Sequence, residues 1–264
     1  MERKDVWAAG NLYEPYVGRW SRIVAREFLP WLAVPHNKEW LEVGCGTGAF
    51  TQTILEAALP RFVMAIDASA DFIEYARAQT RSPLATFEIG DAQALVVDTA
   101  SFDAAVSGLV LNFVAQPVRA VKEMARAVRS GGVVAAYVWD YAGQMELMRY
   151  FWDAAVALDP AAADLDEGLR FPICAPAPLS ELFAHAGLRA VEVRSINVPT
   201  YFQDFDDYWS PFLGGQGPAP GYAISLSEER RSVLRERIRA KLPISADGGI
   251  SLTARAWAVK GYVP

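Results

Sequence analysis

The sequence predicts an α/β protein with a doubly wound, mostly parallel sheet, and three observations lead to this prediction. Short apolar runs alternate with segments of helical periodicity over the first half of the 264-residue chain. The runs are almost continuously apolar, as strands are when helices cover both faces of a parallel sheet. One helical segment, residues 117–132, begins with proline and ends with paired glycines, which are start and stop signals. Repeated strand–helix units wind right-handed and place ligands beyond the carboxyl ends of the strands.

Strands and helices alternate in a fixed order through this first half. The expected helices are residues 49–59, 69–79 and 117–132, and Ser69 is the expected N-cap of the second. The expected strands are residues 39–43, 61–67, 84–90, 102–108 and 133–139.

The alternation loosens after residue 140. Helical periodicity at 144–158 and 179–187 is followed by two strand-like segments, 190–200 and 251–263. The fifty or so residues between these strands are too many for a hairpin loop in a compact domain. We therefore expect residues 201–249 to be an insertion, whose aromatic and turn-rich composition suits a lid over an apolar pocket.

Composition indicates a globular protein of enzyme size rather than a partner of nucleic acid. Hydrophobic residues make up 52% of the chain, and its net charge is −6, whereas phosphates are met by positive surfaces. The amino end lacks the apolar core of a signal peptide, and no apolar run reaches the roughly 18 residues of a membrane span. Cys45 and Cys174 give neither a disulfide framework nor metal-ligand spacing. We expect a cytoplasmic protein, monomer or homodimer, without metal, membrane or nucleic-acid partners.

The arginine-rich segment 228–242 calls for a separate interpretation, because basic runs also occur in nucleic-acid-binding proteins. Leu234, Ile238 and Leu242 form an apolar stripe at helical spacing, and glutamates are interspersed among the arginines. This pattern is typical of a packed helix with a solvated charged face.

A glycine-rich turn joins the first strand to its helix in the segment "WLEVGCGTGAF", residues 40–50. Gly44, Gly46 and Gly48 cost backbone entropy, which indicates that bare backbone must come close to something there. Dinucleotide-binding proteins use the pattern G-x-G-x-x-G, whereas this turn reads G-x-G-x-G with Ala49 at the last position of that motif. The turn alone is compatible with a nucleotide-like ligand or with no ligand.

Two aspartates at strand ends strengthen the expectation of a ligand. Asp67 closes the second strand, 23 positions after Gly44, close to where an acid that binds ribose hydroxyls is expected. Asp91 follows the third strand and has two compatible roles, as the N-cap of a helix and as an acceptor for an adenine amino group.

Together these segments resemble the ordered motifs of class I S-adenosylmethionine-dependent methyltransferases. "LEVGCGTG", "AIDAS", "IGDAQAL", "FDAAVSGLVL" and "MARAVRSGGVVAAYVWD" are similar to the branch around the ubiquinone-biosynthesis methyltransferases, over about residues 10–140. The resemblance implies a seven-stranded Rossmann-like sheet with an antiparallel last strand. It also implies S-adenosylmethionine as cofactor, its methionine portion facing the glycine turn, its ribose facing Asp67 and its adenine facing Asp91. The cofactor-binding residues it implies are Gly44, Cys45, Gly46, Gly48, Asp67, Ala68, Asp91, Ala92 and Ser107.

The amino-terminal segment 11–22 supplies a candidate partner for the cofactor carboxylate. S-adenosylmethionine has no phosphates, so the absence of a lysine after Gly48 agrees with it. Our hypothesis pairs Arg19 with the carboxylate and places Tyr13 or Tyr16 as a lid. An amphipathic helix with an exposed arginine explains the same residues.

The methyl acceptor is expected to be a small organic molecule, methylated at oxygen, nitrogen or carbon by direct in-line transfer. Alignment of the reactants alone supplies roughly 7–11 kcal/mol, so a dedicated base is optional. Asp140, at the end of the fifth strand, is the candidate base, although it is equally placed to cap the next helix. The candidate substrate-binding residues are Tyr13, Tyr16, Trp139 and Trp209.

Two other functions share these motifs. An NAD-dependent oxidoreductase has the same fold and the acid after the second strand, but a different glycine spacing. A non-catalytic S-adenosylmethionine-binding protein has every cofactor motif and no reaction. For a methyltransferase we expect one domain over residues 1–264. Its parts are an N-terminal helical lid (1–38), a cofactor-binding core (39–140), helices and a sixth strand (141–200), a substrate lid (201–249) and a last strand (250–264).

Overall fold

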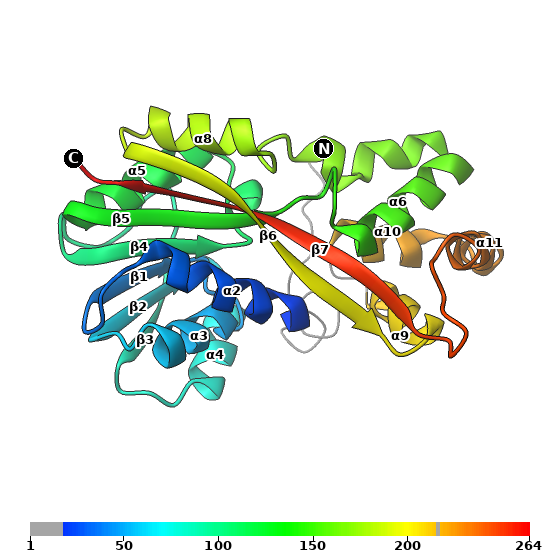
Figure 1. The fold of residues 1–264 in the computed structure, drawn as a ribbon, viewed down its shortest axis with the longest axis horizontal. Coiled ribbons are helices and arrows are strands. Elements are labelled where there is room, and N and C mark those ends of the chain that lie inside the picture. The colour runs from blue at the N-terminus through cyan, green and yellow to red at the C-terminus, as the bar shows by residue number, and fades with distance from the viewer. Residues whose placement is uncertain (1–17, 215–216) are drawn as a thin grey trace. The chain divides into compact units, whose positions relative to one another are not determined.

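A computed structural model describes residues 18–214 and 217–264 of the chain (Figure 1). Its central feature is a seven-stranded sheet in the order β3-β2-β1-β4-β5-β7-β6. Strands β1 to β5 pair in parallel, and β7 runs antiparallel to β5. The prediction of a mostly parallel, seven-stranded α/β sheet is therefore confirmed. The strands are β1 (Glu39–Val43), β2 (Phe62–Asp67), β3 (Ala85–Ile89), β4 (Phe102–Gly108), β5 (Val128–Trp139), β6 (Arg189–Phe202) and β7 (Ile250–Tyr262).

The chain divides into two compact units. The sheet unit comprises Ser21–Trp139, Ile173–Ile196 and Ala256–Pro264. The second unit comprises Asp140–Pro172 and Asn197–Arg255, together with residues 18–20. Helices of the sheet unit are α2 (Arg19–Leu32, which begins before this unit), α3 (Ala49–Ala57), α4 (Ala70–Gln79), α5 (Pro117–Ala127) and α8 (Pro176–His185).

Helices cover both faces of the sheet in the sheet unit. Strand order places β2 and β3 on one side of β1, and β4 and β5 on the other, so right-handed crossovers send their helices to opposite faces. Figure 1 shows this arrangement, with α3 and α4 on one face and α5 and α8 on the other. The central strands are accordingly buried on both sides, and Leu41, Val63, Ala105 and Val134 are fully inaccessible to solvent.

Strand β1 connects the two halves of the sheet. Leu41 is in register with Met64 of β2 and with Ala105 of β4. The parallel register brings the carboxyl ends of β1, β2 and β4 to one edge, and that edge carries the glycine turn and Asp67.

One boundary differs from the sequence prediction. The helix expected over residues 117–132 ends at Ala127, and β5 begins directly at Val128, which pairs with Phe102. Gly131 has a φ of 78°, and a side chain at Gly132 would lie 2.6 Å from the carbonyl oxygen of Asp103. The two glycines therefore serve an irregular, closely packed start of a strand rather than the end of a helix.

The expected N-cap of α4 is confirmed. The side-chain oxygen of Ser69 accepts a hydrogen bond from the backbone N–H of Phe72, at 3.3 Å. This bond satisfies one of the free N–H groups of the first turn and fixes where α4 begins, directly after the end of β2.

The second unit is built from short helices around an aromatic core. Phe151 stacks on Phe212 with ring centroids 4.6 Å apart, and the hydroxyl of Tyr208 donates to the carbonyl oxygen of Leu147 at 2.9 Å. Its helices are α6 (Glu146–Leu158), η3 (Pro160–Leu165), α7 (Glu167–Arg170), α9 (Phe205–Trp209), η4 (Ser210–Leu213), α10 (Pro218–Ser225) and α11 (Glu228–Arg239).

Helix α11 has the structure that its sequence predicts. Leu234 and Ile238 are fully buried, whereas the arginines pair with acids, Arg235 with Asp206 at 2.9 Å and Arg230 with Asp159 at 3.2 Å. Its charged face is therefore partly neutralised by the unit's own carboxylates.

The second unit also buries an acid, Glu167. Its carboxyl group accepts a hydrogen bond from the indole nitrogen of Trp152, and burial raises the pKa of Glu167 to about 8. The neighbouring Asp166 is held by Arg149 through two contacts, at 2.7 and 3.1 Å. At neutral pH the Glu167 side chain is therefore mostly protonated.

We expect the stability of the protein to fall at alkaline pH because of Glu167. Its pKa is higher in the folded than in the unfolded state, so its contribution is complete below about pH 4.5 and disappears as the pH rises through about 8. Glu167→Gln, which stays neutral, should flatten this dependence and exceed the wild type at about pH 9 by on the order of 1–3 kcal/mol. Urea unfolding across this pH range measures the difference. Parallel curves for the two proteins would contradict the prediction.

Candidate active site

The glycine turn between β1 and α3 is fastened to the neighbouring strand. The backbone N–H groups of Gly44 and Cys45 both donate to the carbonyl oxygen of Ile66 in β2, at 2.7 and 3.0 Å. Gly44, Gly46 and Gly48 have φ angles of 82°, 50° and 81°, in the left-handed region that favours glycine. The three glycines are therefore required by backbone conformation as well as by space.

The three glycines differ in what surrounds them. A Cβ atom at Gly44 would lie 2.5 Å from Val110 Cγ2, and one at Gly48 would lie 3.2 Å from the Cβ atom of Ala76. Among the described residues, nothing lies within 4 Å of the position that a Cβ atom at Gly46 would occupy. Gly44 and Gly48 permit close packing, whereas Gly46 leaves an open surface over the backbone that a ligand can approach.

Cys45 contributes its backbone rather than its thiol. Its side chain is buried in a cluster with Ala65, Ile73, Ala76 and Phe87. Burial raises the pKa of the thiol well above its usual value, so it stays protonated at neutral pH. A protonated, buried thiol is no nucleophile.

Asp67 holds the glycine turn and the start of α4 at once. One carboxylate oxygen accepts from the N–H of Gly46 and the other from the N–H of Ser69, both at 2.9 Å. Burial raises the pKa of Asp67, while backbone N–H groups, including that of Ala68, lower it. A carboxylate oxygen has a second lone pair, so Asp67 can still accept hydrogen bonds from the hydroxyls of a ligand.

Glu42 is part of this site, although the strand pattern did not single it out. It is 1% exposed, and Thr51 Oγ1 donates to its carboxylate at 2.5 Å. Burial raises the pKa of Glu42 to about 8, and the charge of Asp67 contributes to the increase. The available signal was an acid inside an otherwise apolar strand, a position that is costly unless the acid has a partner or a function.

Asp91 lies next to Asp67 across the strands. Asp67 is in register with Ile89, and the N–H of Gly90 donates to the carbonyl oxygen of Asp67 at 3.0 Å. The helix that Asp91 was expected to cap does not form. Its exposed carboxylate instead accepts from the backbone N–H of Gln93 at 2.8 Å, which lowers its pKa, and Ala92 lies within this turn.

Ser107 ties β4 to β1. It is fully buried, and its hydroxyl donates to the carbonyl oxygen of Val43 at 2.8 Å. This bond holds the strand end next to the glycine turn, so the residue has a structural role that the sequence did not indicate.

Asp140 lies in the turn between β5 and α6. Its carboxylate accepts from the backbone N–H of Gln144 at 2.9 Å and lies 3.7 Å from the Arg255 guanidinium. The carboxylate therefore closes the turn that precedes α6, whose N-cap residue is Met145 and not Asp140, the residue that the capping interpretation would require.

The remaining predicted residues are scattered. Trp139 is buried at the end of β5 in the sheet unit, whereas Trp209 is buried in the second unit, its ring parallel to that of Phe205. Arg19 begins α2, but its side chain is outside the described set, and so are Tyr13 and Tyr16. The described residues that converge at one sheet edge are the glycine turn, Glu42, Asp67, Asp91 and Ser107.

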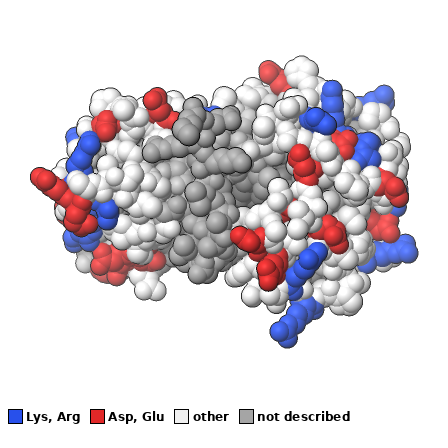
Figure 2. All heavy atoms as spheres, turned by 180° about the vertical axis from the view of Figure 1, so that it is seen from behind, with Lys and Arg blue, Asp and Glu red and all other residues white. Residues whose placement is uncertain are grey.

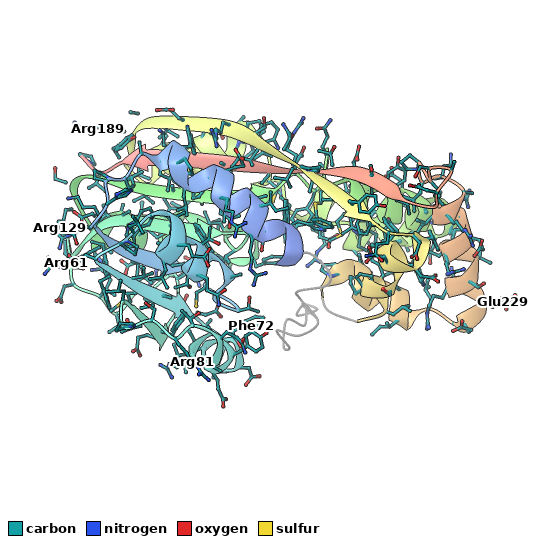
Figure 3. All side chains as sticks on the ribbon, turned by 60° about the horizontal axis from the view of Figure 1, so that its bottom comes forward. Arg61, Phe72, Arg81, Arg129, Arg189 and Glu229 are labelled. Carbon is teal, nitrogen blue, oxygen red and sulfur yellow. The ribbon has the colours of Figure 1, made fainter. Side chains whose placement is uncertain are left out.

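The charge near the turn is negative. Burial is the main cause of the raised pKa values of Cys45 and Glu42, and the negative charge of Asp67 raises both further. Figure 3 places Arg61 and Arg129 at the edge where the strands begin, whereas Phe72, in the first turn of α4, lies at the other edge. An acidic surface of this kind favours a ligand that carries positive charge and disfavours a pyrophosphate.

A cavity of about 390 Å³ lies at the edge where the strands begin, away from the glycine turn. It is lined by Lys38, Asp103 and Arg129 among others. Its charges satisfy one another, since Lys38 and Arg129 each lie 3.3 Å from Asp103. This cavity is separate from the glycine turn.

The surface and the helices add two observations. Figure 2 shows Lys and Arg interspersed with Asp and Glu on the face that it displays.

Within residues 18–214 and 217–264, no helix has the length and apolarity that crossing a membrane requires.

Comparison with known proteins shows which domain family and which folds the chain is similar to. The methyltransferase-domain family matches residues 41–136. A demethylmenaquinone methyltransferase of Roseiflexus castenholzii is 33% identical over 103 residues, which cover 39% of this chain and 43% of that protein. An uncharacterized methyltransferase of Mycobacterium tuberculosis is 31% identical over 114 residues, which cover 43% of this chain and 44% of that protein. The chain thus spans less than half the length of these curated relatives.

A solved structure extends the likeness to most of the chain. Phosphoethanolamine N-methyltransferase 2 of Haemonchus contortus, in complex with S-adenosyl-L-methionine, superposes with a TM-score of 0.57 at 13% identity. The superposition covers 93% of this chain and 53% of that one. The superposition and the strand order confirm the methyltransferase-like fold that the resemblance implies, with its antiparallel last strand, and the methyltransferase-domain match lies within the sheet unit.

Proposed function

We propose that this protein binds S-adenosylmethionine at the glycine turn and transfers its methyl group directly to a small organic acceptor. The observation that carries the proposal is the open turn, where Gly46 exposes backbone beside the carboxylate of Asp67. When bound, the cofactor supplies an electrophilic methyl group on a sulfonium.

The side chains at the turn suit such a ligand. Asp67 has lone pairs left for ribose hydroxyls, and Asp91 is exposed at the end of the adjoining strand, where an adenine amino group would need an acceptor. The backbone around Gly46 would hold the methionine portion. These assignments extend the sequence predictions for the turn, Ala68 and Ala92.

The carboxylate of Asp67 at the turn also argues against the alternative function, an NAD-dependent oxidoreductase. A pyrophosphate beside Asp67 would be repelled, and the turn itself contains no Lys or Arg. A cationic sulfonium and ammonium would be attracted to the same place. A non-catalytic S-adenosylmethionine-binding protein would share this electrostatics, so an activity measurement must separate the two.

A small acceptor is supported by the second unit. Arg235 and Arg230 of α11 are engaged with Asp206 and Asp159, which leaves them less free to bind phosphates. The acceptor named for one curated relative, demethylmenaquinone, is itself a small molecule. Trp139, Trp209 and the tyrosines 13 and 16 stay proposed as acceptor-binding residues.

Calorimetric titration tests the cofactor first. We expect S-adenosylmethionine and S-adenosylhomocysteine to bind and NAD not to bind, and the reverse order would overturn the proposal. Transfer of a radiolabelled methyl group into a metabolite extract then tests the activity. Label found in a small-molecule fraction supports it, whereas cofactor binding without any transfer supports the non-catalytic alternative.

Glu42 is expected to make the affinity for the sulfonium depend on pH. Its pKa of about 8 means that it acquires negative charge as the pH rises past neutrality. Binding of S-adenosylmethionine relative to uncharged-sulfur S-adenosylhomocysteine should therefore strengthen by about tenfold from pH 6 to pH 9. Glu42→Gln should remove this change, and titrations of both ligands with both proteins measure it. An unchanged ratio in the wild type would contradict the prediction.

Asp140 is expected to act mainly by stabilising the turn before α6. Since its carboxylate is bonded to the Gln144 N–H, Asp140→Asn should lower the free energy of unfolding by about 1 kcal/mol and leave kcat within about twofold. A loss of about 100-fold in kcat at unchanged stability would instead establish Asp140 as the general base. Thermal unfolding and single-turnover methyl transfer distinguish the two results.

A further inference from the structure

An unpaired amide lies directly after β4. Asn112 is part of η2 (Leu111–Phe113) and is 8% exposed. Within the described part of the chain, neither its side-chain nitrogen nor its side-chain oxygen has a hydrogen-bond partner. Burying both atoms without partners is costly, and such groups are rare in folded proteins. The amide is therefore either a cost that the fold tolerates or a group that awaits a ligand.

Its position favours a ligand. Asn112 follows Val110 by two residues, and the Val110 side chain lies against Gly44 of the glycine turn. Helix η2 also packs against β5 and α5. The amide thus belongs to the loop that touches the proposed cofactor site, at the edge where ligands of doubly wound sheets bind.

A second unpaired group lies at the end of the neighbouring strand. Trp139 is 1% exposed at the end of β5, and no described residue accepts a hydrogen bond from its indole N–H. Gly108 and Tyr137 are the last residues that β4 and β5 pair with each other, and both Asn112 and Trp139 follow this pair, although Trp139 still pairs with Ala256 of β7. Two buried polar groups, one after β4 and one at the end of β5, therefore lack a described hydrogen-bond partner at the carboxyl edge of the sheet.

Trp40 provides an internal comparison. Its indole N–H is also buried and unpartnered within the described residues, but it pairs in register with Ala104, at the amino-terminal half of the sheet. If a missing acceptor were only a cost that the fold tolerates, the indole N–H groups of Trp40 and Trp139 would behave in the same way. A ligand bound at the carboxyl edge would contact the Trp139 N–H and not that of Trp40.

We propose that Asn112 and Trp139 bind the polar group of the methyl acceptor, and that this group is a carboxamide or lactam. The Asn112 amide offers one donor edge and one acceptor edge, which match the C=O and the N–H of another planar amide. The Trp139 N–H then donates to the second lone pair of that C=O. A carboxylate matches less well, because its oxygens face the Asn112 oxygen without a proton between them. The inference rests on the proposed function, since it assigns a substrate class to that site.

The test uses benzamide as a probe on the S-adenosylhomocysteine-loaded protein. In ¹⁵N NMR spectra, benzamide should shift the Asn112 side-chain NH₂ signals and the Trp139 indole signal, and leave the Trp40 indole in place. Asn112→Leu, Trp139→Phe and Trp40→Phe assign the three signals. Methyl benzoate, which lacks the N–H donor, should bind about tenfold more weakly than benzamide.

Affinity measurements on the variants complete the test. Asn112→Leu and Trp139→Phe should each weaken benzamide binding by about tenfold, with S-adenosylhomocysteine affinity within about twofold, and Trp40→Phe should change neither. Asn112→Asp, which keeps the size of the side chain, replaces the leucine variant if that one does not fold.

Several results would overturn the inference. They are an Asn112→Leu protein that melts higher and binds benzamide unchanged, equal shifts of the Trp40 and Trp139 signals, or no response of Asn112 to benzamide. Failure of the wild type to bind S-adenosylhomocysteine would overturn the proposed function instead, and the benzamide response of the free protein would still decide the role of Asn112.

Discussion

Replacing Gly44 with alanine is expected to weaken cofactor binding by about 100-fold or more. We expect no other glycine-to-alanine substitution in the turn to have a larger effect. The added carbon would lie 2.5 Å from Val110 Cγ2, well inside van der Waals contact, and the φ of 82° is itself unfavourable for alanine. Either the turn or the loop after β4 must move. Because the turn is tied to Ile66, we also expect the free energy of unfolding to fall by about 2–4 kcal/mol.

Gly46→Ala is the matched comparison. Its Cβ atom would meet no described residue within 4 Å, so its cost in stability should be limited to about 1 kcal/mol of backbone strain. Its methyl group would nevertheless occupy the open side of the turn and should impair cofactor binding. Calorimetric titration and urea unfolding of both variants separate the two effects. Equal losses of stability would show that the packing of Val110 against Gly44 is not what makes that glycine necessary.

Asp67→Asn is expected to reduce cofactor affinity by about 100-fold or more. The carboxylate accepts from the N–H groups of Gly46 and Ser69, one on each oxygen. An asparagine can replace one oxygen, but its NH₂ group then faces a backbone N–H, and two donors repel. The variant therefore loses an anchor of the turn in addition to an acceptor for the ribose.

Asp71→Asn is the control for this prediction. Asp71 lies in the first turn of α4 and is exposed, so its charge affects the helix but not the glycine turn. The Asp71→Asn protein should bind the cofactor with an affinity within about twofold of that of the wild type. If Asp67→Asn also retained normal affinity, the assignment of the site to the β1–β2 edge would be wrong.

The sequence was sufficient for the sheet because its strands are buried on both faces. Continuous apolar runs such as residues 102–108 have few alternatives to a central strand, and β4 has those bounds. The glycine turn and Asp67 were also predictable, because backbone conformation and strand-end position are local properties. Ser69 as a cap follows from the same local rule.

The features that sequence reasoning missed depend on contacts between distant residues. The burial of Glu42 and its bond to Thr51 are set by α3 packing on the strand, which periodicity does not describe. Residues 128–132 become strand because Val128 meets Phe102, a pairing that overrides the glycine stop signal. The missing helix after Asp91 has a local reason, since Gln93 satisfies the carboxylate within a turn.

The hydrogen bond from the Gly46 N–H to Asp67 has a consequence for how a ligand binds to the turn. The turn already holds its backbone in place through Asp67 and Ile66, so entry of a ligand needs no prior loop ordering. A receptor organised in advance loses little conformational entropy on association. Amide hydrogen exchange at Gly46 should accordingly be slow in the free protein and change little on saturation.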